Sequence, residues 1–261
     1  MATPNRFALR DAGDVTFYDL TSGKAIVTLE SVKEANMEFS GETTYARGGY
    51  GNPKLVGFSS NREGTFSLTE ALFDKNAIAM LTGNELTEGT KTIKFNEKKE
   101  VISNKVTLSK TPVGAIDSVY ELLPDGTNGQ EYTLGDPTTN DDEYSITDKE
   151  ITFSTSVSNG KNIRVYYNVD TPTDAKNMRV SSDAFGGTFR VVADVIVKDS
   201  ENGQLFAAQV EIPRGKFEDN FSFSLSVDGD PATLDMPIEM LKDPLTNNLW
   251  EMTIYDEDAI V

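Results

Sequence analysis

The strongest constraint on the fold is a long run of alternating apolar and polar residues between positions 217 and 240. Apolar side chains occupy every second position from Phe221 to Val227, and serine or aspartate fills the positions between them and directly after them. This two-residue period is typical of a β-strand with one apolar and one polar face. A turn is expected at 228–230, after which the alternation resumes from Leu234 to Met240. The pattern predicts a large antiparallel sheet with one wet face.

Other segments have strand patterns, and they make the predicted fold mainly β. The expected strands are 15–18, 25–29, 32–40, 64–72, 90–95, 100–102, 187–199, 204–212 and 249–255. Pro213 is expected to end the strand 204–212 because proline donates no ladder hydrogen bond. One short amphipathic helix is predicted after Phe73, with Asp74 as its N-cap and Gly83 at its C-terminal stop.

The composition changes near Lys105, where many short strand patterns are separated by proline, glycine and asparagine turns. No helical pattern interrupts residues 105–171, so this segment is predicted to be an inserted small β-sandwich (Ig-like) module that faces outward. Residues 1–104 and 172–261 then form one discontinuous domain.

The residue types exclude several kinds of active site. The chain has no cysteine and no histidine, so thiolate metal sites, His-ligated zinc and a Ser-His-Asp triad are impossible. A net charge of −18 disfavours wrapping around nucleic acid, because binding to phosphates requires clustered lysine and arginine side chains. No apolar run approaches the roughly 20 residues of a membrane-spanning helix. Acidic clusters at 136–143 and 228–235 match no EF-hand loop and are interpreted as solvated turns. We therefore expect no enzyme and no cofactor.

Residues 41–61 break the regular pattern with five glycines and one proline. Two interpretations remain open at this point: a mobile surface loop, or an extended loop that orders against another subunit. Tyr45, Arg47 and Tyr50 favour the second interpretation, because tyrosine and arginine are common interface anchors.

Three parts of the sequence together resemble the major tail tube proteins of tailed bacteriophages. They are SGETTYARGG, which ends an early strand; GTFSLTEALFDKNAIAMLTG, a strand directly before the helix; and the C-terminal segments FEDNFSFSLSVDGDPATLDMPIEML and LWEMTIYDED. The resemblance covers 1–104 and 172–261, and it is one of style more than of a diagnostic motif. The insertion departs from the minimal family pattern and resembles the β-sandwich decorations of some tube proteins.

The resemblance implies a structural virion protein in the phage tail, assembled in the host cytoplasm. Six copies are expected to form a ring, and stacked rings form a tube whose inner strands close into a continuous β-barrel. The implied contents and neighbours are genomic DNA and the tape measure protein in the lumen, the baseplate and tail terminator proteins, and a sheath if the tail contracts.

The same resemblance suggests roles for particular residues. It implies that 41–61 is the inter-ring loop, with Tyr45, Arg47 and Tyr50 as contacts. Polar faces of 32–40, 64–70, 187–199 and 219–228 are expected to line the lumen. The candidate lumen acids are Glu34, Glu38, Asp194 and Asp228. Two other functions remain as alternatives: another virion structural protein, such as a capsid decoration or baseplate component, and a carbohydrate-binding or hydrolytic β protein.

Overall fold

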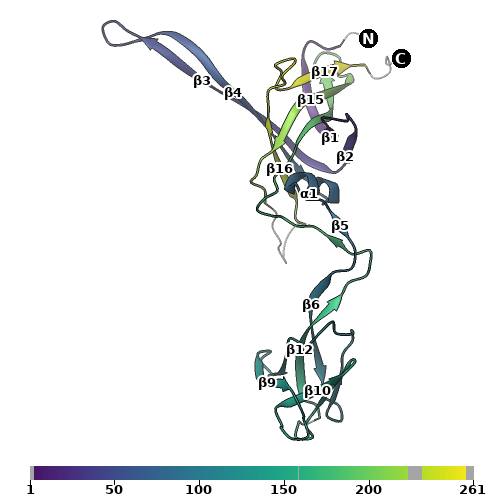
Figure 1. Cartoon of the computed structure of the whole chain (residues 1–261). Coiled ribbons are helices and arrows are strands. Elements are labelled where there is room, and N and C mark those ends of the chain that lie inside the picture. Colours follow the sequence, from purple (N-terminus) through teal and green to yellow (C-terminus); the bar gives the residue numbers. More distant parts are fainter. Residues whose placement is uncertain (1–2, 158, 223–230, 257–261) are drawn as a thin grey trace. The chain divides into compact units, whose positions relative to one another are not determined.

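The computed structural model describes residues 3–157, 159–222 and 231–256, and it is mainly β (Figure 1). It contains two compact units. Unit 1 consists of Met1–Leu86 and Met178–Val261, and unit 2 of Thr87–Asn177. The sequence placed the insertion at 105–171. The structure draws a wider boundary, because the strand Thr92–Glu100 pairs along its whole length with Asn162–Asp170 inside unit 2.

Unit 1 is built on one sheet in the order β2-β1-β14-β15-β16-β4-β3, with β17 paired to β15. Its strands are β1 (Phe7–Asp19), β2 (Ala25–Leu29), β3 (Val32–Arg47), β4 (Lys54–Glu70), β14 (Thr188–Asp199), β15 (Leu205–Phe217), β16 (Leu234–Met240) and β17 (Glu251–Tyr255). All of their pairings are antiparallel. The alternation seen in the sequence gives every strand a face that can be buried, and the sheet is the way these faces meet.

The sheet curls until it is almost a closed barrel, and its apolar face encloses the core. Side chains from β1 and β3, which are far apart in the strand order, line one shared cavity. Three aromatic rings lie in the core: Phe17 stacks on Phe217 at 5.4 Å between centroids, and Phe189 packs edge-on against both. The opposite face of the sheet is therefore left to polar residues and solvent.

The predicted helix is confirmed as α1 (Lys75–Thr82). Asp74 caps it by accepting hydrogen bonds from the backbone N–H groups of Asn76 (2.7 Å) and Ala77 (3.1 Å). Gly83 ends it in the left-handed conformation, with φ of 66°. Ala77 and Leu81 are buried in the core cluster, so the helix covers part of the apolar interior of unit 1.

Three predictions, one of a loop and two of strand ends, were wrong. Residues 41–61 do not form a loop, because β3 and β4 pair from Val32↔Glu70 out to Arg47↔Lys54 and leave only a short turn. Residues 90–95 and 100–102 are not two separate strands, because β6 (Thr92–Glu100) runs straight through the polar residues 96–99 between them. Pro213 does not end β15, because a bulge opposite Arg190 accommodates the missing N–H and the strand continues to Phe217.

Unit 2 contains a seven-stranded sheet in the order β6-β12-β8-β9-β10-β11-β7 and a two-stranded pair. Besides β6 its strands are β5 (Thr87–Glu88), β7 (Lys105–Thr107), β8 (Ser118–Leu122), β9 (Asn128–Leu134), β10 (Glu143–Thr147), β11 (Glu150–Phe153), β12 (Asn162–Asp170) and β13 (Lys176–Asn177). The sheet folds over its own core, which includes Val119, Ile151 and Ile163. One pairing, β9 with β10, is parallel.

Replacing Gly83 with alanine tests the helix stop. A Cβ at this position would lie 2.1 Å from the backbone oxygen of Phe185, and φ is already unfavourable for an L residue. We expect Gly83→Ala to lower the free energy of unfolding of unit 1 by more than about 2 kcal/mol. Urea unfolding followed by the fluorescence of Trp250, the single tryptophan, measures this change.

Gly49→Ala is the matched control. Gly49 also has a positive φ, of 82°, but nothing lies within 4 Å of its missing Cβ. It should lose about 1 kcal/mol, the cost of the backbone conformation alone. Equal losses at the two glycines would show that the nearby backbone of Phe185 adds no cost to a side chain at position 83.

Candidate assembly surfaces

The outer halves of β3 and β4 form a hairpin that projects from the rest of unit 1 (Figure 1). From position 42 to 47 and from 54 to 63 every residue is exposed. The turn 48–53 is closed by a hydrogen bond from the Gly48 N–H to the Pro53 carbonyl (3.3 Å). The glycines that suggested a loop serve this turn, where Gly49 and Gly51 both have φ of 82°.

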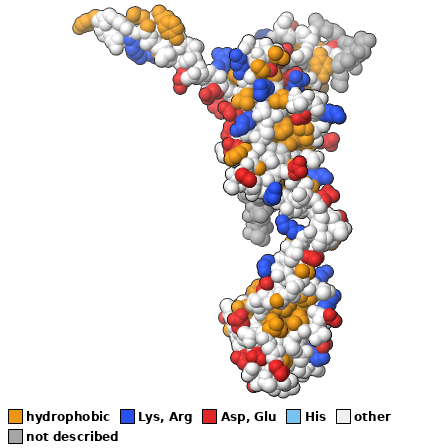
Figure 2. Space-filling model, in the orientation of Figure 1, with side chains coloured by type: hydrophobic (Ala, Val, Ile, Leu, Met, Phe, Trp, Pro, Cys, Tyr) orange, Lys and Arg blue, Asp and Glu red, His pale blue; other side chains and the backbone are white. Residues whose placement is uncertain are grey.

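Both faces of this hairpin carry exposed apolar side chains, and Figure 2 shows them together with basic side chains. On one face the Lys54 ammonium lies 3.8 Å from the centre of the Tyr45 ring. On the other face lie Val56 and Phe58, with Phe58 63 % exposed. A two-stranded ribbon has no core of its own, so its apolar side chains stay in water unless another surface covers them.

The residues predicted as contacts are all on this hairpin. Tyr45 and Arg47 are on β3, and Tyr50 is fully exposed at the turn. Sequence reasoning missed Leu55, Val56 and Phe58, which are among the most exposed large apolar residues of the hairpin. Their signal was the apolar run after Pro53, which the surrounding glycines obscured.

A second surface is the polar face of the sheet, where three of the four predicted acids lie. Glu34 and Glu38 are exposed on β3, and Asp194 is exposed on β14 and accepts a hydrogen bond from Gln209 Nε2 (3.1 Å). The neighbouring residues on both strands, such as Ala35 and Ala193, face the core. The three acids therefore share the face that points away from the core.

Two further acids extend this face and were missed from the sequence. Asp235 and Glu239 on β16 pair with Thr69 and Thr65 of β4, which in turn pair with Glu34 and Glu38. The alternation from Leu234 to Met240 could have revealed them, because they occupy the positions between its apolar residues. Four acids thus stand on two strands, β3 and β16, on either side of β4, with Lys216 beside Glu239 at the border with β15.

The remaining candidate of the lumen face, Asp228, lies outside the described residues. Within the predicted lumen segment 219–228, the structure describes only 219–222, and these residues are not in a strand. Phe221 nevertheless packs against the core cluster of unit 1.

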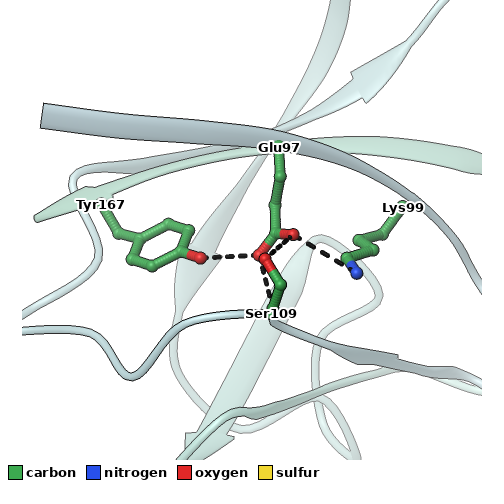
Figure 3. A network of polar contacts seen from close by, with 4 residues as sticks. All are labelled: Glu97, Lys99, Ser109 and Tyr167. Carbon is green, nitrogen blue, oxygen red and sulfur yellow. Dashed lines mark hydrogen bonds and ion pairs between the residues drawn. The ribbon is translucent and has the colours of Figure 1, made fainter. Parts of the chain in front are cut away.

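Unit 2 contains a compact polar network centred on Glu97 (Figure 3). Tyr167 Oη and the Ser109 N–H donate to Glu97 Oε1 at 2.6 and 2.8 Å, and Ser109 Oγ donates to Oε2 at 2.5 Å. Lys99 Nζ lies 3.3 Å from Oε2. Burial by itself raises the pKa of Glu97, but the hydrogen bonds from Ser109 and Tyr167 outweigh it, and the net shift is downward. Burial, together with the bond to Glu97, raises the pKa of Tyr167 to about 12.

This network connects neighbouring strands, and its groups are not arranged as in a catalytic site. Glu97 and Tyr167 belong to the paired strands β6 and β12, and Ser109 follows β7. Among the described residues, no group of three or more acids could hold a metal ion. The one described helix is too short to cross a membrane.

Comparison with known proteins decides the family. The model of the YomU/Tube protein family matches residues 7–253, which is nearly the whole chain. The chain belongs to the YomU/Tube protein family. The resemblance to phage tail tube proteins is thereby confirmed, and membership in this structural family of the phage virion tail means that the chain is not an enzyme.

A curated relative supports the same family. This chain is 32 % identical over 111 residues to a tail tube protein of Bacillus phage SPR. This match covers 41 % of the chain and 42 % of the relative, so it spans about two fifths of that protein's length. The family match also includes all of unit 2, which lies inside residues 7–253.

Glu97→Gln tests the network in unit 2. At neutral pH we expect the variant to lower the local free energy of unfolding of β6 and β12 by about 1–3 kcal/mol, because buried donors lose a charged acceptor. Hydrogen exchange of peptides from these two strands measures this change. Since the pKa of Glu97 is lowered on folding, its contribution is present above the ordinary pKa of 4.5 and is lost as pH falls below that value. The difference between wild type and variant should therefore shrink in acid.

Glu150→Gln is the control, because Glu150 forms an ion pair with Lys105 (2.6 Å) in which both side chains are about half exposed. Its cost should stay below about 1 kcal/mol. Equal costs for the two variants, or a difference that does not change between pH 7 and pH 3, would contradict the role given to Glu97.

Proposed function

We propose that this chain polymerises through its projecting hairpin into the tube of a phage tail, as stacked six-membered rings around an acidic channel. The observation that carries the proposal is the hairpin formed by β3 and β4, whose outer half is exposed on both faces and is rich in apolar side chains. Membership in the YomU/Tube family supports it.

The energetics of the hairpin favour a binding role over a free one. Fully burying a Val, Leu or Phe side chain contributes roughly 1.5–3 kcal/mol. Leu55, Val56 and Phe58 are mostly exposed in the isolated chain and therefore gain little of this burial energy there. Tyr45, Arg47 and Tyr50 add the side-chain types that most often anchor interfaces. Docking on a neighbouring ring would bury these residues and order the ribbon at the same time.

The edge strands of the sheet are compatible with the proposed ring of six copies. Its terminal strands are β2 and β3, so the free edge of β3 can accept a strand from the next copy and remove an exposed edge. Ring closure of this kind would turn the polar faces of six sheets toward one channel. Glu34, Glu38 and Asp194 would then line it, together with Asp235 and Glu239.

An acidic lining suits the passage of DNA. Carboxylates repel phosphates over the screening length, which is about 8–10 Å at physiological salt, and so prevent the duplex from adhering to the wall. Genomic DNA and the tape measure protein are the proposed contents of the channel. The baseplate, the tail terminator and, in a contractile tail, a sheath are the proposed neighbours, and unit 2 is the proposed external decoration.

Shortening the hairpin tests the proposal. Replacing residues 44–58 with Asn-Gly joins Thr43 directly to its ladder partner Ser59 through a two-residue turn. Electron microscopy should show tubes from the wild type and none from the shortened chain. Trp250 fluorescence should give the same unfolding midpoint for both, because the removed residues are not part of the core. Normal tubes from the shortened chain would refute the role of the hairpin.

The absence of native cysteine allows a direct test of the lumen. Glu38→Cys should react with a small maleimide in free subunits and in tubes, but not with a maleimide-coated gold particle wider than the channel once tubes have formed. Lys149→Cys, at an exposed position of unit 2, should react with both reagents in both states. Gold labelling of Glu38→Cys along the length of intact tubes would place this face on the outside.

A further inference from the structure

Unit 1 has an apolar groove beside α1, separate from the hairpin and from the acidic face. Its volume is about 320 Å³, and its lining is predominantly apolar. Phe73, Met178, Val180 and Phe221 contribute to the lining together with the helix residues Ile78 and Leu81. Val180 is 66 % exposed and Met178 is also exposed, so among the described residues the groove remains open to solvent.

The groove and the hairpin are at opposite ends of one strand. The tip of the hairpin is at the start of β4, beside Lys54, whereas β4 ends at Glu70, which pairs with Leu234 of the groove lining (Figure 1). Phe73 follows three residues after the strand end. At about 3.3 Å per residue, the twelve residues from Phe58 to Glu70 separate the two surfaces by roughly 40 Å. The hairpin of one chain therefore cannot reach its own groove.

The two surfaces are complementary in polarity and in charge. Both present exposed apolar side chains. Residues 43–61 contain Arg47 and Lys54 and no acid, although the whole chain has a net charge of −18. The positions within three residues of a lining residue have more acids than bases. The acids include Asp74, Glu85, Asp183, Glu218 and Asp219, and the bases are Lys75, Lys176 and Arg179, of which Arg179 lines the groove itself. A basic apolar ribbon is thus complementary to a mainly apolar groove whose surroundings have an excess of acids.

We propose that the hairpin tip of one copy docks in the α1 groove of the next copy. This inference rests on the proposed function and names its receiving surface. The contact is head to tail, because a surface at one end of unit 1 meets a different surface at the other end of the next molecule. Contacts of this kind repeat without limit along an axis and build an open filament.

Two charged substitutions can block the two halves of the joint separately. Phe58→Asp blocks the hairpin, and Val180→Asp blocks the groove. Both side chains are largely exposed, so both chains should fold with the wild-type unfolding midpoint, as reported by Trp250 fluorescence. Each variant alone should lose all sedimentable polymer. Leu245→Asp, at an apolar position that is 89 % exposed elsewhere in unit 1, should polymerise like the wild type.

Mixing the two blocked variants gives the decisive measurement. The mixture still contains an intact groove in the Phe58→Asp copy and an intact hairpin in the Val180→Asp copy. Each unjoined species of one variant can therefore join to one unjoined species of the other variant. Analytical ultracentrifugation should detect twice the mass of the unjoined species and nothing longer. A mixture that does not join at all would overturn the proposal.

Cross-linking identifies the partners directly. Wild-type-like copies carrying Phe58→Cys and one affinity tag are assembled with copies carrying Val180→Cys and a second tag, and a flexible bismaleimide is added. The product with both tags should form at least tenfold more than when Leu245→Cys replaces Val180→Cys. A product that joins two Phe58→Cys copies instead would overturn the head-to-tail contact.

The outcomes separate this inference from the proposed function. A wild-type chain that forms no polymer would overturn both. Wild-type tubes together with equally long Val180→Asp tubes would overturn only the groove as the receiving surface and leave the tube function standing.

Discussion

The structure of unit 1 depends on one long antiparallel pairing between β3 and β4, which runs from Val32 to Arg47 and is shifted in register at three bulges. Its inner half is a wall of the core, where Met37 and Phe66 face the same interior as Phe17 and Phe217. Its outer half continues the same hydrogen bonds into solvent without a core beneath it. Because pairing resumes beyond a bulge between Ser40 and Glu42, the ordered sheet supports a ribbon that would be marginally stable in isolation. The proposed assembly surface is thus held at a fixed place by the same interaction that closes the core.

The two faces of the sheet separate packing from charge. Alternation places every second side chain inside, and the curl of the sheet lets one interior serve all eight strands. Acids can then collect on the outer face without desolvation, because neither Glu34 nor Glu38 is buried. In unit 2 an acid lies deeper, and Glu97 is retained there only through three kinds of donor from Tyr167, Ser109 and Lys99. The tolerance for charge therefore follows from the position of each residue in the sheet.

Glycine and proline show how much local sequence depends on tertiary context. Gly83 was recognisable as a helix stop because the helical pattern ends directly before it. The glycines between 41 and 61 suggested a loop, yet two of them form a tight turn, and Gly57 allows the Tyr45 ring to pack across the ladder. Pro213 suggested the end of a strand, yet a bulge absorbs it. For the glycines at 41–61 and for Pro213, unlike Gly83, the neighbouring strand, which local sequence does not specify, decided the outcome.

The sequence by itself determined the fold class, the single helix with both of its caps, and the absence of histidine or thiol chemistry, because these follow from local periodicity and composition. It also indicated Tyr45, Arg47 and Tyr50 and three acids that share one face. Only the tertiary structure decided that residues 41–61 form a ribbon, that Asp235 and Glu239 join the acidic face, and that Val180 and Phe73 meet beside α1. The physical reason is that these features are made by residues far apart in the chain, whose meeting is set by strand order and register and not by any local pattern.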